Sequence, residues 1–277
     1  MLKTNPSSKT PLKRLGFLEN FPQIGIFHLV QALDLGVANL HVRSDSELMV
    51  KQMQTAEAPS VVALAHGDQV VDSIEVGVGR RHSGDLAPKL AELMSKNRVQ
   101  PRDVEAVAVS RGPGGYTGLR VGLASALALT LVNQAKLLAI PTLEGMAWQS
   151  PAEWKAVRMV ADALRGKAFV KEFKRVGEVW QPTSPLDLVE WEFLATSYAQ
   201  GDAAPLAGPG YRQAFERGLV FSEQAPRVPS TLGLLRAARQ RLANGMADDP
   251  TDVDILYGQP SSAEEQWKKL HPESKVN

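Results

Sequence analysis

Apolar and polar positions follow two different periods along this chain. From residue 47 onward, some stretches alternate or run apolar for a few residues, which predicts strands, and others recur every three to four positions, which predicts helices. The predicted strands cover residues 47–55, 59–66, 69–78, 104–110, 136–140, 156–162 and 167–176. The predicted helices cover residues 83–97, 118–133, 141–147, 187–200 and 230–243. This order predicts an α/β protein of two lobes, each a mixed sheet with helices.

Breaks in the pattern divide the chain into four parts. We expect a first lobe at 47–150, a second, smaller lobe at 151–250 and a polar C-terminal tail at 251–277. Residues 1–46 read as a flexible or accessory extension. A targeting peptide is the alternative, although no apolar core with a small-residue cleavage site is visible. Each lobe is small, so burial against the other lobe or another chain would add to its stability.

Composition narrows the classes of function. The formal net charge is only +1, which gives no bulk electrostatic reason for nucleic-acid binding. The chain has no cysteine, which excludes disulfides, thiolate nucleophiles and cysteine-ligated metals and permits a reducing compartment. No apolar run reaches the roughly 18 residues of a membrane span, so none is predicted.

A glycine-rich turn between the predicted strand at 104–110 and the helix after it is the most distinctive stretch. It reads RGPGGYTGLR, from Arg111 to Arg120. Glycines supply the backbone freedom of a tight turn, and Thr117 is the predicted N-cap of the helix. The residues of interest here are Arg111, Gly112, Pro113, Gly114, Gly115, Tyr116, Thr117 and Arg120.

The known phosphate-binding patterns do not fit this turn. No Lys-Ser or Lys-Thr pair follows Gly118, and Thr117 stands where a dinucleotide-binding loop needs its last glycine. We therefore favour a structural turn over a phosphate cradle. None of the five histidines has another at i+3 or i+4, so one helix cannot supply a histidine pair to a metal. No metal site and no catalytic residue are predicted.

Two helices carry unusual faces that suit a subunit interface. The predicted interface residues are His82, Leu86, Leu90 and Leu93 on the first helix and Gly118, Gly122 and Ala126 on the second. Small residues at spacing four let another backbone approach closely, and glycine inside a helix costs about 1 kcal/mol that close packing can offset. Packing against the chain's own sheet is the alternative for both faces, and His82 also reads as a capping or surface residue.

Several segments of the sequence resemble a known family. Ser110–Gly122, SRGPGGYTGLRVG, is similar to the signature loop of the TsaB (YeaZ) family. Weaker likenesses follow the same order along the chain: Arg81-His82-Ser83, Ile140–Glu144, Asp162–Gly166, Gly208-Pro209-Gly210 and Tyr257–Trp267.

The resemblance implies a two-lobed fold related to actin, sugar kinases and heat-shock ATPases. It also implies a noncatalytic subunit in the formation of N6-threonylcarbamoyladenosine at tRNA position 37. The implied partners are a TsaD-type catalytic paralogue, which carries a metal-binding HxxxH motif, a TsaE-type ATPase and, for the isolated chain, a second copy. No cofactor of its own is implied, and ATP with Mg²⁺ would enter only through the partner subunits. A cytoplasmic location is expected, without direct tRNA binding.

Among the departures from the family, one concerns the metal site, and two alternative functions remain. The family's first strand ends in an aspartate, where this chain has Gln54, and an amide cannot replace a carboxylate's charge toward Mg²⁺. The first alternative is a nucleotide-binding enzyme of the actin-like fold, with ATP held by the glycine turns. The second is a glycoprotease-like hydrolase, which lacks metal-ligand spacing, a cysteine and a nucleophile elbow.

Overall fold

The computed structural model describes residues 47–52, 60–76, 82–199 and 204–257, with positions 267 and 270. The predicted extension at 1–46 and Gln54 lie outside the described residues. For residues 47–52, 82–84, 133 and 199 only the backbone is described.

The first lobe is built on a five-stranded sheet in the order β3-β2-β1-β4-β5. Its strands are β1 (Glu47–Gln52), β2 (Ser60–His66), β3 (Gln69–Val76), β4 (Val104–Ser110) and β5 (Lys136–Ile140). The first three strands form an antiparallel meander, whereas β4 and β5 run parallel to β1. The carboxyl ends of β4 and β5 therefore meet at one edge, and the glycine-rich turn follows β4 there.

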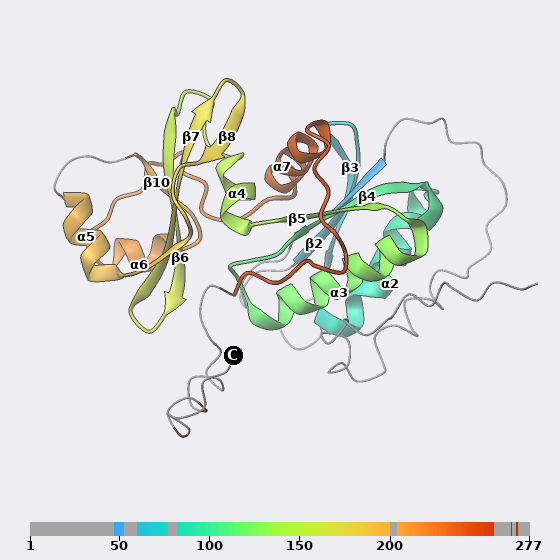
Figure 1. Cartoon of the computed structure of the whole chain (residues 1–277), viewed down its shortest axis with the longest axis horizontal. Helices are drawn as coiled ribbons and strands as arrows, with labels where there is room; N and C mark the ends of the chain where they lie inside the picture. The colour runs from blue at the N-terminus through green and yellow to red at the C-terminus, as the bar shows by residue number, and fades with distance from the viewer. Residues whose placement is uncertain are drawn as a thin grey trace, which may run out of the picture.

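Helices cover both faces of this sheet (Figure 1). On one face lie α2 (His82–Lys96), which precedes a short 3₁₀ helix at Pro101–Asp103, and α3 (Tyr116–Asn133). On the other face lies α7 (Thr231–Ala243). The two-residue period of β4 explains the pairing: Val107 and Val109 pack with the α2 and α3 side, while Ala106 and Ala108 face α7. The small alanines let α7 lie close to the sheet.

Helix α7 packs on the sheet of the first lobe, although the sequence-based division placed it in the second lobe. We grouped residues 230–243 with the second lobe, but Leu234, Leu235 and Ala238 are buried against the first sheet. The helix begins at Thr231, one residue after the predicted start, and the Ser230 side chain caps it by accepting a hydrogen bond from the Gly233 amide at 3.2 Å. The local pattern thus predicted the helix, but it carried no information on which sheet the helix would cover.

The second lobe contains a smaller sheet in the order β10-β6-β7-β8, with β9 paired to β7 beside that path. The strands are β6 (Ala156–Leu164), β7 (Lys167–Val176), β8 (Val179–Pro182), β9 (Asp187–Glu190) and β10 (Leu206–Ala207). One face packs against α4 (Thr142–Ala147), and the other against α5 (Trp191–Ala199) and α6 (Tyr211–Phe215).

Most predicted elements are confirmed, and one assignment is wrong in part. Strands β4, β5 and β7 match their predicted bounds. Residues 187–190, predicted as the start of a helix, form β9 instead, because they pair with β7 from Lys167↔Glu190 to Val170↔Asp187. Tertiary pairing overrides the local preference here, and α5 begins only at Trp191.

None of the helices in the described ranges is long and apolar enough to cross a membrane.

Candidate functional site

The glycine-rich turn is fixed to the start of α4 by backbone hydrogen bonds. The Arg111 amide donates to the Ile140 carbonyl at 2.9 Å, and the Thr142 amide donates to the Gly112 carbonyl at 2.8 Å. Below them, the buried hydroxyls of Ser110 and Thr142 lie 2.7 Å apart and share a hydrogen bond. The turn is therefore held between the ends of β4 and β5.

The chain's own C-terminal segment closes over this turn. We call residues 246–257 the C-terminal strap. The Leu256 amide donates to the Arg111 carbonyl at 2.7 Å. Gly112 has φ +110°, and a Cβ atom there would lie 2.4 Å from the Leu256 carbonyl oxygen. This glycine is required because the strap approaches so closely, and the space beside it is filled by the protein itself.

Helix α3 begins two residues earlier than the sequence suggested, at Tyr116 instead of Gly118. Its N-cap is Gly115, which makes no side-chain capping bond, and the Leu119 amide donates to the Gly115 carbonyl at 3.0 Å. Thr117 lies in the first helical turn with an exposed side chain, so its assignment as N-cap is wrong. The turn geometry set by the glycines lets Tyr116 take the first helical position.

A cluster of two tyrosines and one arginine lies beside the turn. The rings of Tyr116 and Tyr257 are stacked with centroids 4.8 Å apart, and the Arg120 guanidinium carbon lies 4.3 Å from the Tyr116 centroid. The Arg120 Nε atom donates to the Tyr257 hydroxyl at 2.8 Å. Burial raises the pKa of Tyr257 above its ordinary value of 10.0, so its phenol stays protonated at neutral pH.

This Tyr–Arg–Tyr cluster joins residues of the turn to the end of the strap. Tyr116 and Arg120 were predicted from the sequence as residues of interest, whereas no contact of Tyr257 was predicted. Part of Tyr116 reaches the surface, with 44% of the residue exposed. The cluster therefore presents an aromatic and cationic surface at the start of α3.

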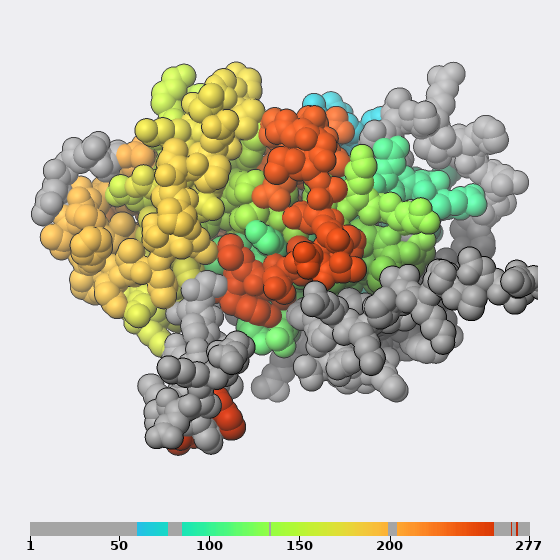
Figure 2. Space-filling model, in the orientation of Figure 1, coloured from blue at the N-terminus to red at the C-terminus, as the bar shows by residue number. Residues whose placement is uncertain are grey.

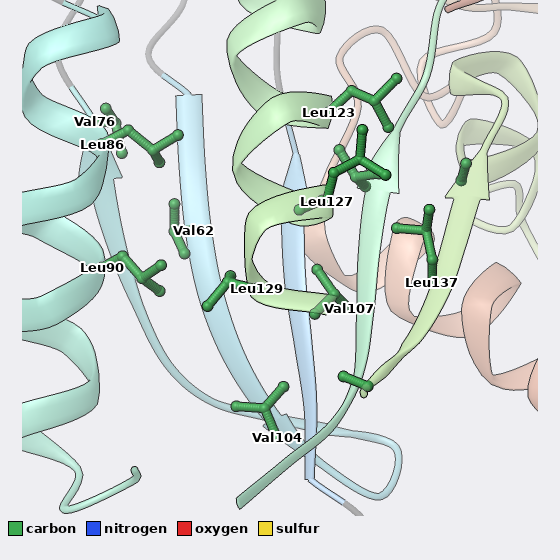
Figure 3. Packing of buried hydrophobic residues seen from close by; sticks show 14 of the residues in the cluster. Val62, Val76, Leu86, Leu90, Val104, Val107, Leu123, Leu127, Leu129 and Leu137 are labelled. Carbon is green, nitrogen blue, oxygen red and sulfur yellow. The ribbon is translucent and has the colours of Figure 1, made fainter. Parts of the chain in front are cut away.

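The leucines predicted for a partner interface belong to the core of the first lobe. Leu86, Leu90 and Leu93 are only 3%, 3% and 1% exposed, and their cluster includes Val62 and Val76 of the sheet (Figure 3). Helix α2 has one apolar stripe, and the sheet needs it for burial. As placed here, these three side chains cannot contact another subunit. The side chain of His82 lies outside the described residues.

The small residues of α3 turn progressively toward the core. Gly118 is half-buried, whereas Gly122 and Ala126 are buried. Positions four apart advance about 400° around a helix, so each step rotates the stripe about 40° from the previous one. The stripe that stays partly accessible follows alternating steps of three and four residues: Gly118, Val121, Ser125 and Ala128. This stripe, continuous with Tyr116, is the accessible small-residue face of α3.

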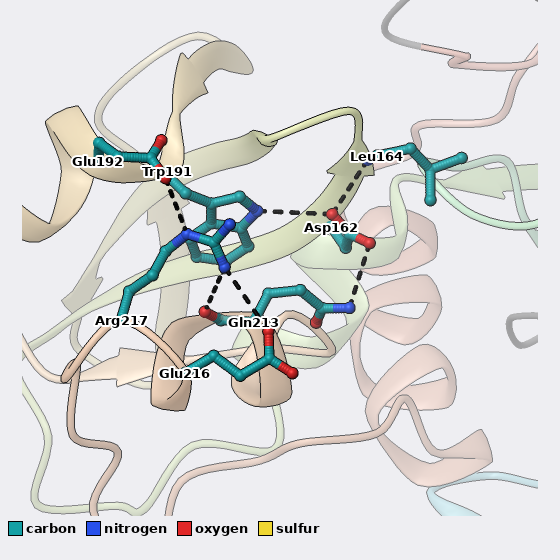
Figure 4. Close-up of polar contacts among 7 residues, drawn as sticks. All are labelled: Asp162, Leu164, Trp191, Glu192, Gln213, Glu216 and Arg217. Carbon is teal, nitrogen blue, oxygen red and sulfur yellow. Dashed lines mark hydrogen bonds and ion pairs between the residues drawn. The ribbon is translucent and has the colours of Figure 1, made fainter.

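The second glycine turn is also filled by the protein. Gly208 has φ +119°, and a Cβ atom there would lie 2.2 Å from the Val160 carbonyl oxygen. Asp162, at the end of β6, accepts hydrogen bonds from the Leu164 amide, the Trp191 indole and the Gln213 side chain at 3.0, 3.5 and 3.2 Å (Figure 4). This carboxylate links β6 to α5 and α6, which is a structural role.

Within the described ranges, no three histidine, cysteine or carboxylate side chains are grouped so that they could hold a metal ion.

Comparisons with known proteins point to one family. The family model described as TsaD, tRNA N6-adenosine threonylcarbamoyltransferase, matches residues 76–249, more than half of the chain. The TsaB protein of Escherichia coli, named for tRNA threonylcarbamoyladenosine biosynthesis, is 26% identical over 240 residues, which are 80% of this chain and 98% of the relative. The chain belongs to the TsaB (YeaZ) branch of the TsaD family.

Other relatives extend over similar lengths. The TsaB protein of Haemophilus influenzae is 25% identical over 229 residues, 78% of this chain and 94% of its own. A crystal structure from Pseudomonas aeruginosa, described as similar to peptidase YeaZ, superimposes with a TM-score of 0.66 at 22% identity. It covers 77% of this chain and 100% of its own. The two-lobed fold that the sequence predicted is thus confirmed as the fold of this family.

Proposed function

We propose that this chain is a noncatalytic partner subunit in the formation of N6-threonylcarbamoyladenosine in tRNA. The observation that carries the proposal is the match to TsaB proteins over nearly their whole length, 98% of the Escherichia coli relative. The histidine spacing supports a noncatalytic role. The five histidines form no HxxxH pair of the kind that the resemblance assigns to the catalytic paralogue.

The proposed partner is a TsaD-type catalytic paralogue, which docks on the first lobe at the accessible small-residue face of α3. Gly118 and Ala128 lie on this face and allow a close approach, and the exposed ring of Tyr116 borders it. On α2 the available side is polar, with Lys89 and Glu92 paired at 2.8 Å. In the absence of the paralogue, a second copy of this chain takes its place and gives a homodimer.

The chain works in the cytoplasm without a cofactor of its own. ATP and Mg²⁺ act through the partner subunits, including a TsaE-type ATPase, and tRNA is bound by the assembly rather than by this chain. The absence of a Walker-type or dinucleotide-binding pattern in the first glycine turn supports this view.

Coexpression tests the proposal. The full-length chain is expressed with a TsaD-type paralogue, and the complex is isolated through a tag on one subunit. We expect a stable complex and no threonylcarbamoyl transfer by this chain alone. Calorimetric titration of the isolated chain with Mg-ATP separates the nucleotide-binding alternative, because the proposal expects no binding heat. Failure to form a complex in either nucleotide state would refute the proposal.

A further inference from the structure

The C-terminal strap is attached to the first lobe at both ends. Near its start, the Asp248 amide donates to the Leu137 carbonyl, and the Asp248 carboxylate accepts from the Ala139 amide, each at 2.8 Å. These bonds occupy the edge of β5. Arg241 of α7 lies 3.7 Å from the same carboxylate, so the start of the strap is tied to α7 as well.

The far end of the strap is anchored at the glycine turn. Ile255 is 9% exposed and belongs to the core cluster that contains α2 and α3. Leu256 binds the Arg111 carbonyl, and Tyr257 stacks on Tyr116. The strap, coloured red, runs from α7 to the start of α3 and lies on the surface of the first lobe (Figure 1, Figure 2).

We propose that Tyr257 is a positioning residue for the partner surface: it holds Tyr116 and Arg120 in the arrangement that the TsaD-type paralogue contacts. This inference rests on the proposed function. It adds that the surface is composite, with one part from the glycine turn and the other from the C-terminal strap, 137 residues further along the chain from Arg120.

The contacts of Tyr257 explain why it would strengthen binding to the partner. A partly exposed tyrosine side chain samples several rotamers unless a neighbour fixes it, and ordering it on binding costs conformational entropy. Stacking on Tyr257 fixes the Tyr116 ring, and the 2.8 Å bond from the Arg120 Nε atom to the Tyr257 hydroxyl fixes the guanidinium. Aromatic and arginine side chains carry much of the binding energy at protein interfaces, so fixing them in advance strengthens association.

The second lobe offers a matched control. Tyr211 follows Gly208-Pro209-Gly210 at the first position of α6, much as Tyr116 follows the first turn. Arg212 donates from Nε to the Tyr211 hydroxyl at 3.1 Å, and the Arg227 guanidinium lies 5.5 Å from the ring. This second cluster has the same chemistry but lies away from α3, so its loss should leave partner binding unchanged.

The experiment measures association and dissociation rates of the full-length chain with the TsaD-type paralogue. The variants are Tyr257→Ala, Tyr257→Phe, Tyr116→Ala, the Tyr116→Ala/Tyr257→Ala double variant and the control Tyr211→Ala. We expect Tyr257→Ala to bind about tenfold more weakly, mainly through slower association, because a smaller fraction of molecules presents the fixed arrangement. Tyr257→Phe keeps the stacking and loses one hydrogen bond, so it should restore part of the affinity.

The double variant separates positioning from direct contact. Because Tyr257 acts through both Tyr116 and Arg120, Tyr257→Ala should weaken binding less in the Tyr116→Ala background than in the wild-type chain. Additive losses, or unchanged binding by both Tyr257 variants while the wild-type chain binds, would overturn the inference and leave the proposed function intact. Absence of binding by the wild-type chain would overturn the proposed function itself. If Tyr257→Ala fails to fold, Tyr257→Phe alone decides, and binding equal to wild type then overturns the inference.

Discussion

Replacing Gly112 with alanine tests whether the C-terminal strap closes over the glycine turn. Gly112 has φ +110°, where a residue with a Cβ atom is strained by about 1–3 kcal/mol. The new Cβ atom would lie 2.4 Å from the Leu256 carbonyl oxygen and 3.1 Å from Leu119 Cδ1. Because the first of these is a backbone atom, the strap itself must move.

The cost of moving the strap can be worked out from its contacts. The bond from the Leu256 amide to the Arg111 carbonyl is worth about 1 kcal/mol, and partial exposure of Ile255 adds about 1 kcal/mol. Together with the backbone strain, Gly112→Ala should lower the free energy of unfolding by about 3–5 kcal/mol. The rigid turn leaves little room for relaxation.

Gly67→Ala is the matched control. Gly67 has φ +58° in the turn between β2 and β3, and a Cβ atom there would meet no atom within 4 Å. Gly67→Ala should lower the free energy of unfolding by only about 1 kcal/mol, which is the penalty of the left-handed conformation. Urea unfolding of both variants, followed by circular dichroism, measures the difference. Equal losses for the two variants would show that the strap does not press on Gly112, and the account of a closed glycine turn would be wrong.

Four further predictions concern α2, α3 and the state of assembly. Hydrogen bonds from Lys96 and then Asn97 lower the pKa of Asp72 to about 2. The stabilisation from its ionised carboxylate is therefore fully present above the ordinary value of 3.8 and is lost as the pH falls through about 2. Asp72→Asn should reduce stability more at pH 7 than at pH 2, as measured by denaturation at each pH. Leu90→Ala should lower the free energy of unfolding by about 2–5 kcal/mol in the same assay, because the side chain is buried. Gly118→Leu should weaken binding to the paralogue more than it shifts the melting temperature, since Gly118 is half-buried, and a collapse in stability would assign this glycine to the core. The isolated chain should self-associate, and sedimentation showing a monomer at high concentration would contradict this.

The parts of the fold set by local pattern could be predicted from sequence. Strands β4 and β5 are apolar runs between turn signals, and α7 begins at a serine cap, so their bounds followed from neighbouring residues. The glycine turn was equally visible, because glycine and proline mark backbone that is neither strand nor helix.

The parts that depend on distant contacts could not be predicted. The local sequence of Asp187–Glu190 predicts a helix, but these residues form a strand because they pair with β7. The leucines of α2 were equally suited to a core or an interface, and only the position of the sheet decided between them. The contact between Arg120 and Tyr257 spans 137 positions in sequence, so no local pattern signals it.

We propose that this chain supports tRNA threonylcarbamoylation as a noncatalytic partner. The most direct test of this proposal is a reconstituted reaction with a TsaD-type paralogue, a TsaE-type ATPase, the threonylcarbamoyl donor, ATP and unmodified tRNA. We expect modified adenosine when this chain is present, almost none when it is left out, and none from this chain alone. Full modification without the chain, or modification by the chain in the absence of the paralogue, would contradict the proposal.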